Sequence, residues 1–219
     1  MSITLTEIRS QARDRADMQN SSFVSDAELT KYVNSSIAEL HDLLIAGGES
    51  DYYLLSTTFN TVASTETYAL PAAFYKLRGV DVQSGGDWIS VRPFNFNERN
   101  SSLSAAYNLS GLDFRYRLAG SNILLSPPPS GVNTVKLWYT PVATKLTADS
   151  DTLDDVNQFA EYVITDAAIK MLQKEESDVS VLLAQKADLR KRIENMVANR
   201  DAGQPESISD IYAENIDDL

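Results

Sequence analysis

The sequence predicts an α+β protein in which an antiparallel helical bundle, made by both ends of the chain, carries an inserted small antiparallel β domain, a barrel or a sandwich. The two ends show the apolar spacing of amphipathic helices, and the middle contains short β-rich runs separated by Gly and Pro turns. An acidic stretch without this periodicity follows. The expected parts are residues 1–50 with 150–202 for the bundle, 51–149 for the β domain and 203–219 for an extended C-terminal arm.

Two capped helices are expected within residues 1–48. Thr4 and Glu7 have the spacing of a capping box, and Ser25 and Glu28 repeat it. Apolar residues at helical spacing follow both boxes, and the polar link between the helices is short, which favours antiparallel packing. The single histidine, His41, lies in the second helix among apolar neighbours. We interpret it as a helix-surface or core-edge residue.

The middle of the chain changes from helical spacing to short strands. Six or seven such strands at this spacing predict a small barrel or sandwich. Residues 96–107 fit either a loop or a short helix. The expected strands are residues 52–59, 65–70, 77–82, 88–91, 114–118, 123–125 and 135–139.

Helical spacing returns near Asp154, with an apolar face so wide that it predicts a largely buried helix. Ser177 is expected to cap a last helix. In that helix Leu182, Leu189 and Met196 recur every seven residues, with Ile193 between them. This spacing predicts a seam for packing within the bundle or between subunits.

The same helix carries the basic cluster Lys186, Arg190, Lys191 and Arg192, alternating with Asp188 and Glu194. A solvated helix face is the favoured interpretation, and a partner interface is the alternative.

Composition disfavours several classes of function. The chain has 19 Lys and Arg against 31 Asp and Glu, a net charge of −12, which argues against phosphate-neutralising DNA binding and against adsorption to anionic membranes. It has no Cys, so disulfides and thiolate chemistry are excluded. No secretory signal is expected, and no run approaches the roughly 20 apolar residues of a membrane span.

No catalytic residue, metal site or cofactor is expected, so the chain is interpreted as a non-enzyme. The acidic run from Asp149 to Asp155 lacks the pattern of a calcium loop, because Asp154 stands where Gly is needed and Ala160 where Glu is needed. This run is better explained as a turn with anions at a helix N-terminus. The Gly-Gly turns do not match a phosphate-binding loop.

The end of the chain is acidic and poor in apolar residues. The stretch from Asp201 to Leu219 carries six carboxylate side chains and no Lys or Arg. Such a segment buries too little apolar surface to fold alone and is expected to order by docking on another chain. Its candidate docking residues are Ile208, Ile211, Tyr212, Ile216 and Leu219.

Several segments, taken in order, resemble a known family. Residues 25–34 read SDAELTKYVN, residues 65–77 read TETYALPAAFYKL, and residues 116–129 read YRLAGSNILLSPPP, followed by LWYTP at 137–141. Together these resemble segments of the head-to-tail adaptor (connector) proteins of tailed bacteriophages, and the resemblance spans residues 3–200.

The resemblance implies a structural virion protein that forms a ring, usually of twelve copies, beneath the capsid portal. The ring extends the DNA channel, through which DNA passes without sequence-specific binding, and presents a platform to a tail or nozzle protein. The C-terminal segment of such proteins embraces the portal, and Gly203–Leu219 is the matching stretch here. The expected location is the head–tail interface of the virion, after synthesis in the host cytoplasm and without a membrane partner.

An alternative from another class is a carbohydrate- or receptor-binding tail module that acts through the β domain. Exposed aromatic side chains would then stack on sugars. The favoured interpretation is that most of them belong to the core of a small β domain, because aromatic residues are enriched in strands. The residues concerned are Trp88, Phe94, Phe96, Tyr107 and Trp138.

Overall fold

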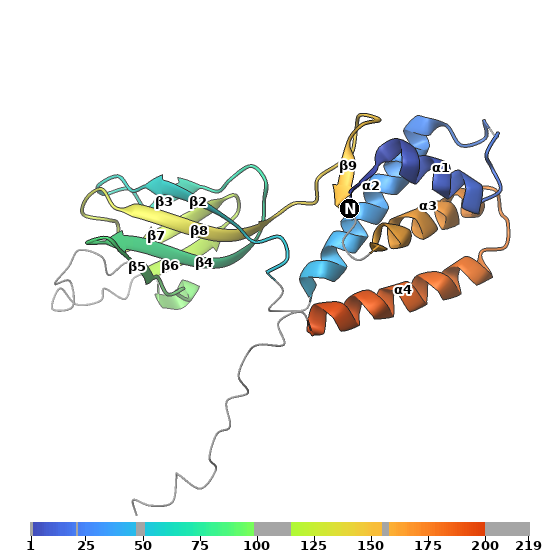
Figure 1. Cartoon of the computed structure of the whole chain (residues 1–219). Coiled ribbons are helices and arrows are strands. Elements are labelled where there is room, and N and C mark those ends of the chain that lie inside the picture. The colour runs from blue at the N-terminus through green and yellow to red at the C-terminus, as the bar shows by residue number, and fades with distance from the viewer. Residues whose placement is uncertain (1, 21, 47–50, 99–114, 155–157, 200–219) are drawn as a thin grey trace, which may run out of the picture. The chain divides into compact units, whose positions relative to one another are not determined.

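The computed structural model describes residues 2–20, 22–46, 51–98, 115–154 and 158–199 (Figure 1). The fold is mixed α+β, with antiparallel sheets, and the described residues contain four α-helices. The chain divides into two compact units. Unit 1 combines Met1–Ser50 with Lys145–Leu219, and unit 2 is Asp51–Thr144.

Unit 1 is helical and is built from both ends of the chain. A two-stranded antiparallel ribbon, in which β1 (Ser2–Thr4) pairs with β9 (Thr152–Asp154), accompanies the helices. The helices are α1 (Leu5–Arg15), α2 (Asp26–Ala46), α3 (Ala160–Lys174) and α4 (Ser180–Ala198).

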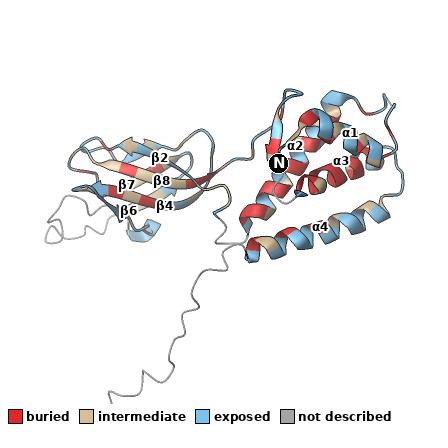
Figure 2. Cartoon of the chain, viewed as in Figure 1, coloured by how far each residue is buried: buried red, intermediate tan, exposed pale blue. Residues whose placement is uncertain are grey.

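The core of unit 1 is organised around α3, which contacts α1, α2 and α4. Figure 2 shows that α3 is buried along most of its length, whereas α4 is mainly exposed. This confirms the largely buried helix that the wide apolar face predicts. Burying each large aliphatic side chain contributes about 1.5–3 kcal/mol relative to exposure. Fully buried members of this core include Leu5, Ile8, Leu29, Val33, Val163, Ala167 and Met171.

The first two helices begin where their capping boxes predict. The Glu7 amide donates to the Thr4 hydroxyl at 3.2 Å, and the Thr4 amide donates to the Glu7 carboxylate at 2.8 Å. The Glu28 amide donates to Ser25 Oγ at 3.3 Å. The bonds to Thr4 and Ser25 each satisfy a helix amide that has no partner inside the helix.

The predicted cap of the last helix was wrong. The carboxylate of Asp178 accepts a hydrogen bond from the Ser180 amide at 2.9 Å, while the Ser177 hydroxyl donates to Glu175. The helix begins at Ser180, with Val179 as its N-cap residue and no side-chain capping bond from that residue.

The acidic run before α3 is partly a strand rather than only a turn. Thr152–Asp154 forms β9, with Ile3 opposite Leu153, so α3 begins at Ala160 and not near Asp154. Residues 145–149 also lie in unit 1, where the Leu146 amide donates to the Asn34 side chain at 2.8 Å.

Unit 2 contains two antiparallel sheets, and neither closes into a barrel among the described residues. The barrel that the sequence left open is therefore wrong. The strands are β2 (Leu55–Asn60), β3 (Thr67–Ala69), β4 (Phe74–Ser84), β5 (Asp87–Ser90), β6 (Arg115–Ala119), β7 (Asn122–Ser126) and β8 (Thr134–Pro141). The first sheet has the order β2-β8-β4-β5 and the second β3-β7-β6.

The two sheets share one core, to which each contributes alternate residues. The first sheet supplies Val80, Val82, Val135 and Leu137, and the second supplies Ile123 and Leu125. Alternation along each strand puts these side chains on one face. In the segment expected to be a loop or a short helix, Phe96–Glu98 forms a short 3₁₀ helix. Residues 99–107 lie outside the described residues.

Candidate interaction surfaces

The predicted packing seam on helix α4 is partly buried and partly accessible. Leu189 is 9% exposed and Ile193 is fully buried within unit 1. Leu182 and Met196 are half-buried. The inner half of the seam packs on α2 and α3 of the same chain, and the outer half stays accessible.

An ionic cluster joins three helices of unit 1. It consists of Glu39 on α2, Asp166 and Lys170 on α3, and Lys186 on α4. Lys186 Nζ lies 2.6 Å from Asp166 Oδ1 and 2.8 Å from Glu39 Oε2. Lys170 Nζ lies 2.6 Å from Asp166 Oδ2. The Asp166 side chain is only 4% exposed, whereas Lys170 and Lys186 are 21% and 22% exposed and Glu39 is 43% exposed, so Asp166 is the buried member of the cluster.

Neighbouring hydroxyl groups complete the hydrogen bonding of this ionic cluster. Ser36 Oγ donates to Asp166 at 2.5 Å, and the Tyr162 hydroxyl donates to Glu39 at 3.3 Å. Burial by itself would raise the pKa of Asp166, but the hydrogen bonds from Lys170, Lys186 and Ser36 outweigh burial and lower the pKa. The carboxylate is therefore held in its charged form.

The ionic cluster changes the interpretation of the basic residues on α4. Lys186 was expected on a solvated face, but it turns inward and its side chain is 22% exposed. Arg190 lies on a solvated face, as predicted. It pairs with Glu194 at 2.8 Å, and both side chains are more than half exposed. One sequence signal could have found the cluster, since Asp166 interrupts an otherwise apolar face and lies four residues before Lys170.

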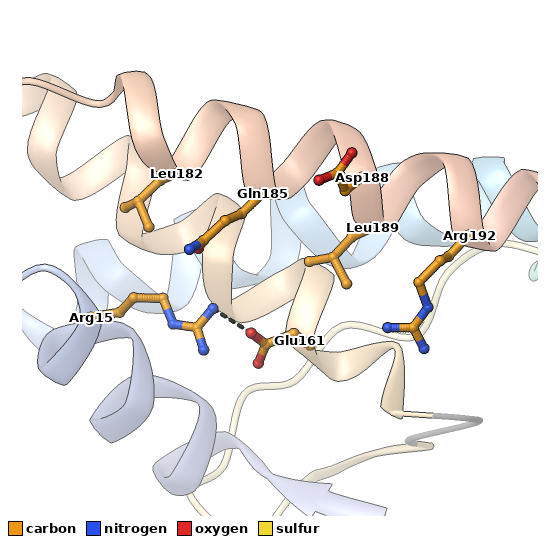
Figure 3. Close-up of a pocket in the computed structure, with 7 residues that line it drawn as sticks. All are labelled: Arg15, Glu161, Leu182, Gln185, Asp188, Leu189 and Arg192. Carbon is orange, nitrogen blue, oxygen red and sulfur yellow. Dashed lines mark ion pairs between the residues drawn. The ribbon is translucent and has the colours of Figure 1, made fainter.

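An open groove of about 580 Å³ runs along the same helix. Figure 3 shows Leu182, Gln185 and Leu189 pointing from α4 towards the Arg15–Glu161 ion pair. Asp188 and Arg192 complete the lining. The lining combines two leucines of α4 with side chains of both signs of charge, a mixture that is common on surfaces that contact other proteins.

The aromatic residues of unit 2 are divided between core and surface. Phe94 is buried, whereas Trp88 and Phe96 are 39% and 56% exposed. Trp138 is half-buried and its indole donates to Asp81 at 2.6 Å. Tyr107 lies outside the described residues.

One face of the Trp88 ring already has a contact within the chain. The Lys136 ammonium lies 3.8 Å from the centre of the Trp88 ring and 5.2 Å from that of Trp138. A sugar stacking on Trp88 would compete with this cation–π contact.

The predicted docking residues of the arm, from Ile208 to Leu219, lie outside the described residues. In the described part of the chain, no group of three His, Cys, Asp or Glu side chains is placed to hold a metal ion. None of the helices described is long and apolar enough to cross a membrane.

The described part of α4 thus carries a groove lined by leucine, glutamine and charged side chains. The family model of the SU10 adaptor protein matches residues 3–208, and the chain therefore belongs to this family. It is thus a bacteriophage adaptor, a structural component of the virion that interacts with other virion components. The family is generally non-enzymatic. No curated protein matches the sequence.

Proposed function

We propose that this chain forms a homo-oligomeric ring, a dodecamer, that joins the capsid portal to the tail or nozzle and extends the DNA channel. The observation that carries the proposal is the family match over residues 3–208, which covers both units. Division of the chain into a helical unit built from its two ends and a β-rich unit supports the arrangement of a bundle with an inserted β domain.

In the proposed ring, the accessible half of the α4 seam and the groove beside it contact the neighbouring subunit. Leu182 and Met196 supply the apolar part, and Leu189 and Ile193 hold α4 on its own bundle. A cyclic ring requires such a heterologous contact, in which one face of a subunit meets a different face of the next.

The proposed portal contact is made by the arm, residues 203–219. Its sparse apolar side chains, Ile208, Ile211, Tyr212, Ile216 and Leu219, would dock on the portal, and the surrounding acids would pair with basic portal residues. DNA would pass through the channel without being gripped, because the acidic residues of the chain outnumber its basic residues and repel phosphates.

The test is negative-stain electron microscopy of the chain mixed with the portal ring from the same phage, with and without residues 203–219. A ring of added density that needs these residues would support both the adaptor ring and the arm. Added density without them would keep the ring and remove the arm's role. If neither mixture shows added density, the ring proposal is wrong.

A further inference from the structure

The four-stranded sheet of unit 2 ends at β2, and the outer edge of that strand has no partner strand among the described residues. We propose that this edge accepts an extended strand from another protein of the virion, by main-chain hydrogen bonds in the plane of the sheet. Such strand addition is a recurrent mode of peptide recognition.

The register shows which backbone groups are available. Leu55 pairs with Tyr139 and Asn60 with Thr134 in one unbroken antiparallel ladder, and the Thr61 amide donates to the Asn133 carbonyl at 2.9 Å. Because hydrogen-bonded and non-hydrogen-bonded pairs alternate, the odd-numbered residues of β2 bond to β8. The amides and carbonyls of Ser56, Thr58 and Asn60 therefore point outward.

The other sheet edges carry features that discourage strand pairing. Strand β3 has three residues and is followed closely by Pro71. Strand β6 contains Arg115 and Arg117, and its Tyr116 carbonyl already accepts a bond from the Phe94 amide. Strand β5 has only four residues and begins with an aspartate. Charges, prolines and short length are common protections of an edge.

Strand β2 has none of these protections. Its six residues, LSTTFN, contain no charge and no proline, and its ladder with β8 has no bulge. Neutral edges without prolines or bulges are the ones on which another strand can add. The difference between β2 and the other edges is the observation that carries the proposal.

The side chains beside the edge define the chemistry of the incoming strand. Leu55, Thr57 and Phe59 face the core side, opposite the buried residues of β8, and Leu55 is still 50% exposed. Ser56 and Thr58 lie on the outer face. The partner is therefore an extended segment of about six residues in which apolar side chains alternate with small uncharged polar ones.

Symmetry favours a different protein over a second copy of this chain. Pairing of β2 with β2 would be a twofold contact, whereas a cyclic ring needs heterologous contacts. The choice of a virion protein as partner rests on the proposed adaptor function.

The test is hydrogen–deuterium exchange at single-residue resolution on the purified chain and on the chain within virions. Ser56, Thr58 and Asn60 should exchange quickly in the free chain and at least about tenfold more slowly in virions. Thr57 and Phe59, which bond to β8, should be protected in both. This alternation is the signature of an added strand.

Variants at Thr58 provide a second test, in virions whose copies of this chain are supplied by complementation. Thr58→Pro removes one outward amide without removing a β2–β8 bond, and Thr58→Ala is the matched control that keeps the amide. We expect Thr58→Pro to reduce the partner protein retained on purified particles at least about fivefold, and Thr58→Ala to leave it unchanged. If Thr58→Pro does not fold, Thr58→Lys replaces it.

The outcomes are distinguishable. A chain that is absent from virions contradicts the adaptor function itself. A chain that is present, but whose outward amides exchange as fast as in the free protein, overturns strand addition alone. Protection that rises with the concentration of the purified chain would assign the edge to self-pairing and also overturn the proposal.

Discussion

Replacing Asp166 by Asn tests how much the ionic cluster contributes to unit 1. The substitution keeps the size of the side chain and removes one of two negative charges. Lys170 and Lys186 then share the single carboxylate of Glu39, from which Lys170 lies 3.4 Å and Lys186 2.8 Å. The remaining cluster carries an excess positive charge at a site where the side chain of residue 166 is 4% exposed.

The expected cost is about 3 kcal/mol, the lower end of the range for breaking a buried ion pair by removing one partner. The lower end applies because both lysine side chains are about one fifth exposed and can turn towards water. At about 4 °C per kcal/mol, the midpoint of thermal unfolding should fall by about 12 °C.

The two units can be followed separately. Both tryptophans, Trp88 and Trp138, lie in unit 2, while the α-helices described lie in unit 1. Circular dichroism at 222 nm therefore reports mainly on unit 1, and tryptophan fluorescence reports on unit 2. The substitution should move the helical transition and leave the fluorescence transition in place.

Glu194→Gln is the matched control, because it removes one charge from an exposed pair with Arg190. It should cost no more than about 0.5 kcal/mol. If Asp166→Asn and Glu194→Gln lower the helical midpoint equally, the ionic cluster does not stabilise unit 1 and the reasoning is refuted.

Three further predictions follow from burial, charge and backbone geometry. The pKa of Asp166 is lowered below its ordinary value of 3.8, so the stabilisation by its charged form should be full above that pH and disappear as the pH falls through the folded-state pKa. The difference in thermal midpoint between wild type and Asp166→Asn should therefore close in an acid titration followed by circular dichroism. Ile193→Ala should lower the free energy of unfolding in urea by about 2–5 kcal/mol, whereas the control Leu183→Ala, on the exposed side of α4, should lower it by less than about 0.5 kcal/mol. Equal losses would contradict the packing of α4. Gly120→Val should lower the free energy of unfolding of unit 2, followed by tryptophan fluorescence, by about 1–2 kcal/mol, because the φ of Gly120 is +58° in the turn between β6 and β7. A loss no larger than that of the control Gly131→Ala would refute this.

Local features of the fold could be predicted from the sequence. The capping boxes at Thr4 and Ser25 fix where α1 and α2 begin, because both partners of each bond are three residues apart. The seven strands of unit 2 lie where β-rich runs between turn residues place them. Their ends differ by a few residues, since a strand ends where its partner ends.

Features that depend on distant residues could not be predicted. The pairing of β1 with β9 joins Ser2 to Asp154, and neither segment is long enough to show an alternating pattern. Lys186 was assigned to a solvated face because spacing along a helix does not show what faces it across the bundle. The exposed edge of β2 was hidden for the same reason, because the order β2-β8-β4-β5 does not follow the sequence.

The same strand order explains how a β-rich unit can interrupt a helical one at little cost. Unit 2 begins at Asp51 and ends at Thr144, and its first and last long strands, β2 and β8, pair with Leu55 opposite Tyr139. Its two ends therefore leave from the same end of one strand pair. Once unit 2 is folded, it joins the two segments of unit 1 as a short connection would, so the conformational entropy cost of bringing them together is that of a short loop. The bonds between Asn34 and Leu146 then fix the returning chain on α2, so the helical core can form from segments far apart in sequence.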